Sequence, residues 1–213
     1  MGGKTKEPTP WAHNLGQDVL LLSYFTYPKG SSIGKMLAFL SLSPLALIFA
    51  LLGAFICTQQ VWYLILIIGQ LSSTLFNEVI KHIIKQPRPV GSTRGGYGMP
   101  SDHSQMMMFF AANMTNMLYL DCWQWPVWLR QTLSGVCFLW AVLVMWSRHM
   151  MKVHSFAQVC AGASCGIPLG CLFYQLLKVL PIADFQRILD GLIGEVLARP
   201  QLFSVDVDPP QMA

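Results

Sequence analysis

The feature that most constrains this chain is a series of long apolar segments that carry almost no charge. Residues 36–57 contain no charged side chain, and four more apolar runs follow at residues 61–84, 105–120, 132–146 and 156–177. A helix needs about 20 predominantly apolar residues to cross the hydrocarbon core of a bilayer. The spacing of these runs therefore predicts an all-α, polytopic membrane bundle with about five transmembrane helices.

Composition supports this fold class and excludes several others. Charged residues make up 11% of the chain and hydrophobic residues 54%, whereas a soluble domain carries about 25% charged residues. The net charge of +4 is small and scattered, so the chain lacks the basic patch of a nucleic-acid-binding protein. We therefore expect the chain to be surrounded by membrane lipid and not to bind nucleic acid.

The segments on either side of the apolar runs differ from them in character. Residues 1–33 form a polar N-terminal segment with a weakly apolar, interfacial stretch, and residues 34–180 hold the membrane domain. Within residues 181–213, apolar side chains recur with helical periodicity from Phe185 to Leu197. This pattern is typical of an amphipathic helix on a membrane surface, and the last residues resemble a disordered tail.

Three polar segments lie next to the predicted spans, and an ionisable residue at membrane depth is a functional hypothesis by default. They are residues 81–89, 97–104 and 147–158. With alternating helices, all three meet at one face of the membrane. We expect the active site there.

The cations of these segments are suited to binding phosphate. Lys81 and Arg88 flank the end of the second span, and Arg148 closes the fourth. Lysine and arginine both bind phosphate oxygens. Ser101 is a good N-cap for the next helix, whose free N–H groups attract anions. A cationic membrane boundary would explain each segment alone, but not their convergence.

Two histidines accompany the cations. One histidine can attack phosphorus while another protonates the leaving oxygen. His103 lies in the first turn of the third predicted span, and His154 opens the fifth. Gln158 follows His154 by one helical turn, so we expect its side-chain oxygen to accept the imidazole N–H. The sequence has no carboxylate cluster or Cys/His spacing for a metal, so we expect neither a metal nor a cofactor.

These segments resemble the motifs of the type 2 phosphatidic acid phosphatase superfamily, K-x6-RP, PSGH and SR-x5-H-x3-D. The matches are Lys81…Arg88-Pro89, Pro100-Ser101-Asp102-His103 and Ser147-Arg148…His154…Gln158. The segments Gln86-Pro87-Arg88-Pro89 and Tyr97-Gly98-Met99-Pro100-Ser101 resemble most closely the branch that acts on dolichyl pyrophosphate in the endoplasmic reticulum. Three ordered motifs are far more specific than one.

The resemblance implies roles for these residues. His154 would be the nucleophile that forms a phosphohistidine, and His103 the general acid and then the base. The phosphoryl oxygens would be held by Lys81, Arg88, Ser101 and Arg148. A polyprenyl (dolichyl) pyrophosphate would be cleaved to the monophosphate and inorganic phosphate, recycling the lipid carrier of N-glycosylation.

Several questions stay open at the level of sequence. Asp102 replaces the small residue of the family motif, and we expect its side chain to point away from the phosphate. Glu78 has helical spacing to both Lys81 and His82. The second phosphate of a diphosphate could be bound by Lys85, Arg94 or Lys152.

The function also has alternatives. The motifs fit a phosphatase for another lipid phosphate, such as phosphatidate or a shorter isoprenoid diphosphate. Asp102 and Gln158 also fit an inactive lipid-phosphate binder. Most lysines and arginines lie on the active face, and this bias favours a cytosolic site, whereas the resemblance implies a lumenal one.

Overall fold

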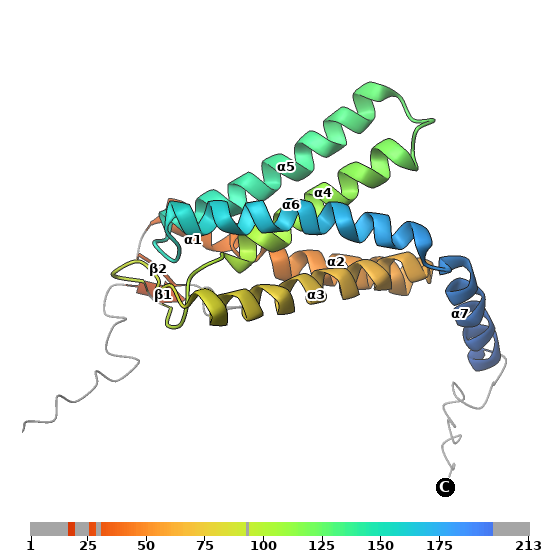
Figure 1. Ribbon diagram of the computed structural model, residues 1–213, viewed down its shortest axis with the longest axis horizontal. Coiled ribbons are helices and arrows are strands. Elements are labelled where there is room, and N and C mark those ends of the chain that lie inside the picture. Colours follow the sequence, from red (N-terminus) through yellow and green to blue (C-terminus); the bar gives the residue numbers. More distant parts are fainter. Residues whose placement is uncertain (1–16, 20–25, 29–30, 93, 198–213) are drawn as a thin grey trace, which may run out of the picture.

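Helices build nearly all of the structure, a computed structural model that describes residues 17–19, 26–28, 31–92 and 94–197 (Figure 1). Two short antiparallel strands, β1 (Gln17–Val19) and β2 (Thr26–Pro28), precede the helices. The helices are α1 (Ser32–Leu40), α2 (Ser43–Thr58), α3 (Val61–Ile84), α4 (Asp102–Leu120), α5 (Val127–Met150), α6 (Phe156–Val179) and α7 (Ile182–Leu197). The predicted tail beyond residue 197 lies outside the described residues.

Every predicted apolar run is helical, which confirms the all-α membrane class. Among the described helices, α3, α5 and α6 are long and apolar enough to cross a membrane, and the bent pair α1–α2 would add a fourth span. Helix α4 is not among them: it is largely buried and carries the buried polar side chains Ser104, Gln105 and Asn113. A helix enclosed by other helices does not need an apolar outer face.

The first apolar run forms two helices instead of the single helix that we expected. The chain bends by 46° between α1 and α2, just before Pro44, which has no backbone N–H and begins α2. Helix α5 fixes this bend from the side: Trp140 Nε1 donates to Ser43 Oγ (2.9 Å), and the hydroxyls of Ser41 and Ser147 are 3.1 Å apart. The bend therefore holds a defined position in the bundle.

Helix α4 packs most extensively against α6, and glycine makes their close approach possible. A Cβ added to Gly162, Gly166 or Gly170 would lie 2.3–2.4 Å from a backbone carbonyl oxygen of α4 or of its N-cap Ser101. Only residues without a Cβ allow two helix backbones to come this close. This stripe fixes α4 and α6 relative to each other.

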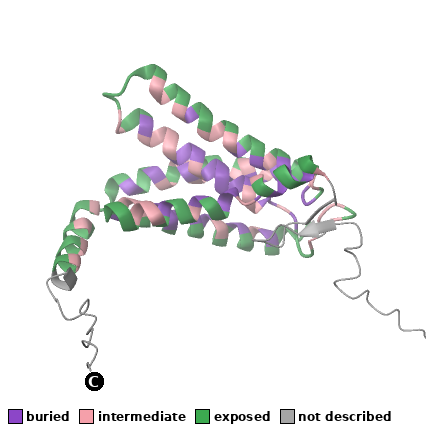
Figure 2. Cartoon of the chain, turned by 180° about the vertical axis from the view of Figure 1, so that it is seen from behind, coloured by how far each residue is buried: buried purple, intermediate pink, exposed green. Residues whose placement is uncertain are grey.

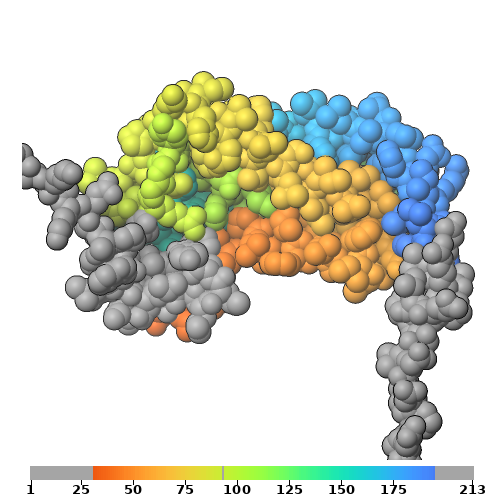
Figure 3. All heavy atoms as spheres, turned by 90° about the horizontal axis from the view of Figure 1, so that it is seen from below, coloured from red at the N-terminus to blue at the C-terminus, as the bar shows by residue number. Residues whose placement is uncertain are grey.

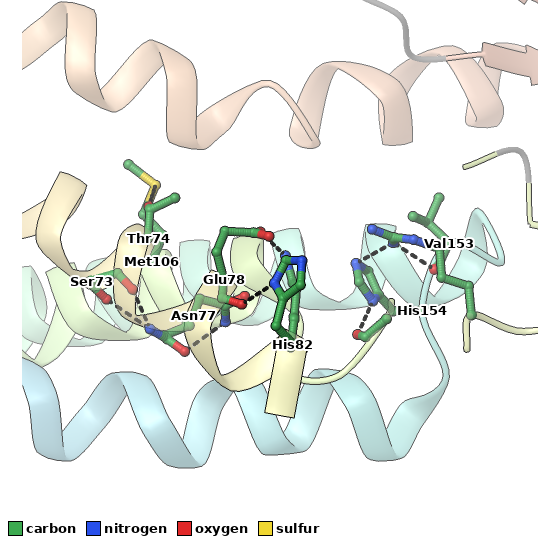
Figure 4. A network of polar contacts seen from close by, with 12 residues as sticks. Ser73, Thr74, Asn77, Glu78, His82, Met106, Val153 and His154 are labelled. Atoms are coloured by element: carbon green, nitrogen blue, oxygen red, sulfur yellow. Dashed lines mark hydrogen bonds and ion pairs between the residues drawn. The ribbon is translucent and has the colours of Figure 1, made fainter. Parts of the chain in front are cut away.

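A polar contact joins α4 to α3 on its other side (Figure 4). Asn77 Nδ2 donates to Gln105 Oε1 at 2.7 Å, and Gln105 Nε2 donates to the Ser73 carbonyl oxygen at 2.7 Å. All three residues are buried. Such bonds satisfy polar groups that could not reach water at this depth.

The outer surface of the bundle is apolar, as a bilayer requires. Exposed residues line the outside of the helices while buried ones gather between them (Figure 2). The large apolar side chains on this outside include Phe49, Leu75 and Leu139. The predicted C-terminal helix is present as α7, held to the start of α3 by Gln186, which accepts from the Val61 N–H and donates to the Gln59 carbonyl. Its place on a membrane surface stays a prediction.

The two ends of the bundle differ. The α3–α4 connection lies at one end and α7 at the opposite end (Figures 1 and 3). The ends of α3 and α5 and the starts of α4 and α6 gather at the first of these ends. All three polar segments therefore lie on the same side of the membrane, as predicted.

We predict that Gly166→Ala destabilises the bundle, because the new Cβ would lie 2.3 Å from the Gln105 carbonyl oxygen. Overpacking of a tight interior typically costs about 1–3 kcal/mol, so the melting temperature in detergent should fall. Gly135→Ala in α5 is the matched control, because nothing lies within 4 Å of its added Cβ. Equal melting temperatures for the two variants would contradict the proposed helix contact.

Candidate active site

The candidate site is built around His154, in the turn between α5 and α6. Its Nδ1 lies 2.9 Å from the Gly98 carbonyl oxygen, and its Nε2 lies 3.0 Å from Arg88 Nη1 (Figure 4). A guanidinium can only donate, so Nε2 accepts and Nδ1 carries the proton. The contacts thus select the tautomer whose Nε2 lone pair faces the cations.

The surroundings keep this imidazole neutral. Burial, and then the positive charges of Arg88, Arg148 and Lys81, lower the pKa of His154 from 6.5 to about 3, and the bond to Gly98 opposes the shift. The ring is only 3% exposed. A neutral imidazole is the nucleophilic form.

Arg88 is held by two backbone carbonyls, one from its own α3–α4 loop and one from the α5–α6 turn. Its Nε donates to the Gly95 carbonyl oxygen (3.1 Å), and its Nη1 donates to that of Val153 (3.2 Å). Burial and the charge of Arg94 lower the pKa of Arg88. These bonds place the guanidinium beside His154 before any anion arrives.

Lys81 and Arg148 add two buried cations from the neighbouring helices. Arg148 is fully buried and Lys81 is 7% exposed. Lys81 forms an ion pair with Glu78, whereas His82 bonds through Nδ1 to the backbone oxygen of Glu78. The Glu78 carboxylate therefore pairs with the lysine and not with the histidine.

Ser101 and His103 begin α4, as the sequence predicted. Ser101 is the N-cap of α4, but its side chain makes no capping bond: its hydroxyl accepts from Ser104 Oγ, and its N–H donates to the Gln158 carbonyl. His103 Nε2 lies 3.1 Å from the Ser41 carbonyl oxygen at the bend between α1 and α2. His103 also lies within electrostatic reach of His154 and Arg148.

Gln158 does not touch the His154 ring, and this corrects the expected contact. Its Oε1 accepts from the Ser155 N–H in a capping box, and its Nε2 donates to the Pro87 carbonyl at 2.8 Å. The Gly98 carbonyl occupies the place that we expected for Gln158. A Cβ on Gly98 would lie 2.7 Å from the Gln158 amide, so the two residues are packed together.

Gln158 therefore connects the three motif segments. Its side chain holds Pro87, and its backbone carbonyl accepts from Ser101. Its amide also packs against Gly98, whose carbonyl bonds to His154. Its connection to His154 passes through the backbone of the α3–α4 loop.

Asp102 lies close to the cations of the site. Its Oδ1 is buried and accepts no hydrogen bond from the residues that the structure describes. Its charge raises the pKa of Arg88 and of Arg94, against the lowering caused by their burial. The carboxylate therefore lies within electrostatic reach of both arginines, and the expected direction of its side chain relative to a phosphate stays a prediction.

The three cations considered for a second phosphate occupy different positions. Lys85 and Lys152 are exposed, and each has a positive φ at a turn that follows a helix. Arg94 is half-buried in the α3–α4 loop. The structure thus separates Arg94 from the two lysines.

Two functional groups were missed by sequence reasoning, the carbonyls of Gly98 and Ser41. Each is the backbone partner of one histidine. Every residue has a backbone carbonyl, so residue type cannot predict which carbonyl orients a histidine. The nearest sequence signals for these two were Gly98 itself and Pro44 after the bend. Across the described part of the chain, no group of three or more His, Cys, Asp or Glu side chains is placed to hold a metal ion.

Comparison with known proteins finds a matching family and several relatives. The family model of the PAP2 superfamily matches residues 60–180, which include all the motif residues. A "Dolichyldiphosphatase" of Saccharomyces cerevisiae is 34% identical over 74% of this chain and 70% of its own length. The "Dolichyldiphosphatase 1" of Homo sapiens is 33% identical over 78% of this chain and 74% of its own length.

Two further similarities concern function and fold. The "Lipid phosphate phosphatase gamma" of Arabidopsis thaliana is 30% identical over 83% of this chain and 80% of its own length. A crystal structure of a PAP2-type phosphatidylglycerolphosphate phosphatase from Bacillus subtilis has a TM-score of 0.57 and 21% sequence identity. The match covers 69% of this chain and 78% of that chain. This likeness shows the shared transmembrane fold.

We predict that His154 stays neutral as the pH falls through the usual histidine range. Its lowered pKa of about 3 means that protonation begins only in strong acid. The measurement is 15N NMR of histidine-labelled protein in detergent, with the His154→Gln variant identifying the signal. An imidazolium signal from His154 at pH 6 would contradict the described environment.

We predict that Gln158→Glu lowers kcat/KM by about tenfold or more, because the carboxylate cannot donate to the Pro87 carbonyl and leaves it unsatisfied. If Gln158 acted on the imidazole directly, a carboxylate there would preserve or increase activity. Gln86→Ala is the control, because the Gln86 side chain is exposed and its Oε1 accepts only a long hydrogen bond (3.4 Å) from Gln158 Nε2. We expect that variant to change kcat/KM little.

Proposed function

The chain belongs to the PAP2 superfamily, and we propose that it is a membrane phosphatase that hydrolyses polyprenyl diphosphates such as dolichyl pyrophosphate. The products are the lipid monophosphate and inorganic phosphate. The reaction passes through a phosphohistidine on His154 and uses the charges of the chain in place of a metal.

One observation carries the proposal most directly: the His154 tautomer and the cation that faces it. The Gly98 carbonyl fixes the proton on Nδ1, and Nε2 faces Arg88. A phosphoryl group that enters here would take over the Arg88 N–H as an acceptor and meet the Nε2 lone pair. Buried cations stabilise the charge that develops on its oxygens.

In the first step, Nε2 of His154 attacks the terminal phosphorus. The bond from phosphorus to the bridging oxygen breaks, and the lipid monophosphate departs with the proton of His103. Lys81, Arg88 and Arg148 hold the three oxygens of the transferred group, with Ser101 at the start of α4. Gln158 supports the loop that orients the nucleophile.

In the second step, water attacks the phosphohistidine. His103, now neutral, takes a proton from the water as the P–N bond breaks. Inorganic phosphate leaves, and His154 regains its Nε2 lone pair. The bond from His103 to the Ser41 carbonyl orients this ring for both steps.

The substrate class is supported by the names of the relatives. Proteins called dolichyldiphosphatase match most of this chain at 33–34% identity. This similarity supports the proposal that the protein acts in the endoplasmic reticulum membrane, with its site in the lumen, and recycles the lipid carrier of N-glycosylation. Several lysines and arginines on the active face serve the site itself, which weakens the charge bias toward the cytosol.

A second candidate is a phosphatase for other lipid phosphates. The plant relative named lipid phosphate phosphatase gamma favours it. The cations that bind the transferred phosphoryl group would serve a monoester and a diphosphate equally. A substrate panel distinguishes the two candidates.

The test is phosphate release from dolichyl pyrophosphate by purified protein in detergent with EDTA. We expect release to resist EDTA and to disappear in His154→Ala, because that variant lacks the nucleophile. A lipid monophosphate is a good leaving group, so His103→Ala should slow the attack of water more than the first step. With terminally labelled substrate, that variant should therefore accumulate acid-labile phosphate on the protein.

Two results would count against this mechanism. One is hydrolysis that persists in His154→Ala, and the other is hydrolysis that EDTA abolishes. Lack of turnover by a folded wild-type protein that still binds phosphate would instead support the inactive binder, with Asp102→Ser as the variant to test for recovery.

A further inference from the structure

A diphosphate substrate brings a second phosphate that is not transferred, and the mechanism above gives it no partner. This question rests on the proposed function. The missing partner should be a cation next to the cluster around His154 but outside the set that holds the transferred group.

The loop that carries Arg94 is bound to the site by its own backbone. The Gly95 carbonyl accepts from Arg88 Nε at 3.1 Å. The Gly98 N–H donates to the Gln86 carbonyl at 2.8 Å, and Tyr97 pairs with Pro87 in an isolated bridge. Arg94 directly precedes the carbonyl that holds Arg88, so its position is tied to that guanidinium.

Arg94 lies within electrostatic reach of the same cluster. Burial lowers the pKa of Arg94, and the charge of Arg94 lowers that of Arg88. Arg148 also lies within electrostatic reach of Arg94. Like charges that are held together and partly desolvated form a site for an anion with more charge than Arg88 alone would bind.

The other two cations near the site do not share this arrangement. Lys85 is the C-cap of α3, and Lys152 lies in the α5–α6 turn; both have a positive φ of about 55° and exposed side chains. Among the described contacts, neither lysine side chain makes a hydrogen bond or an ion pair. An arginine also matches two phosphate oxygens at once, which a lysine does not.

We propose that Arg94 binds the phosphate that remains on the lipid, and thereby makes the site prefer lipid diphosphates to lipid monophosphates. In a monophosphate substrate this position holds the lipid alcohol oxygen and the start of the hydrocarbon chain. Arg94 then has no phosphate to bind, so its contribution is specific to the diphosphate.

The experiment compares kcat/KM for a polyprenyl diphosphate and for the matching monophosphate in wild type and Arg94→Gln. Loss of a charge-assisted hydrogen bond should reduce kcat/KM for the diphosphate by about ten- to a hundredfold. The monophosphate should change much less. Lys85→Gln and Lys152→Gln are matched controls that each remove one nearby charge. For both, the ratio of kcat/KM for the diphosphate to kcat/KM for the monophosphate should equal that of wild type.

A second measurement needs no turnover. Methylenediphosphonate and inorganic phosphate are compared as stabilisers of the protein in a thermal-shift titration. Arg94→Gln should weaken the stabilisation by the diphosphonate and leave the stabilisation by phosphate nearly unchanged. For Arg94→Lys, the stabilisation by the diphosphonate should fall between those of wild type and Arg94→Gln. If Arg94→Gln does not fold, the Arg94→Lys variant decides in both assays.

The outcomes separate this inference from the proposed function. Equal losses for both substrates, or no loss for either, would overturn the role of Arg94. A wild-type protein that hydrolyses only monophosphates would overturn the proposed function instead. In that case a diphosphonate affinity that depends on Arg94 would still support the second-phosphate site, and an affinity that does not would overturn it as well.

Discussion

The close approach of α4 and α6 is the constraint on which the site depends. His103 lies in the first turn of α4, and His154 lies just before α6. Their distance therefore follows from how these two helices meet. Gly162 faces the carbonyl of Ser101, and Gly166 faces that of Gln105, so the contact begins directly beneath the site. A bilayer gives helices no hydrophobic drive to associate, and tight packing between small residues supplies part of the attraction instead. The same stripe that holds the bundle together thus sets the separation of the two histidines.

A site with several buried cations is costly unless its geometry is fixed from elsewhere. Burial disfavours the charged form of each group, and neighbouring positive charges add repulsion. The chain offsets this with backbone acceptors and nearby carboxylates. Arg88 bonds to two carbonyls, Glu78 pairs with Lys81, and Asp102 lies within the field of Arg88 and Arg94. In the proposed reaction, an arriving phosphate would meet groups that are already in position, which leaves little reorganisation for the reaction itself.

The sequence was sufficient for the fold class and for much of the site, because both depend on side-chain type and spacing. Long uncharged runs predict membrane helices, and three ordered motifs predict which of their ends meet. What it could not predict depends on the backbone. The carbonyls of Gly98 and Ser41 orient the histidines, but any residue would present the same group. The bend between α1 and α2 had a local signal in Pro44, yet membrane helices also tolerate proline without breaking. Helical spacing predicted that Gln158 would accept the N–H of His154, but the Gly98 carbonyl in the α3–α4 loop accepts it instead.

The position of Gln158 explains why a neutral amide suits this site where the wider family pattern has aspartate. Its nitrogen must donate to the Pro87 carbonyl, and its oxygen must accept from the Ser155 N–H. A carboxylate can satisfy only the second bond, and would face a carbonyl oxygen with its other oxygen. Because the Gly98 carbonyl already holds the Nδ1 proton of His154, the ring needs no carboxylate for its orientation. The amide therefore joins the α3–α4 loop to the start of α6 without adding a negative charge to the site.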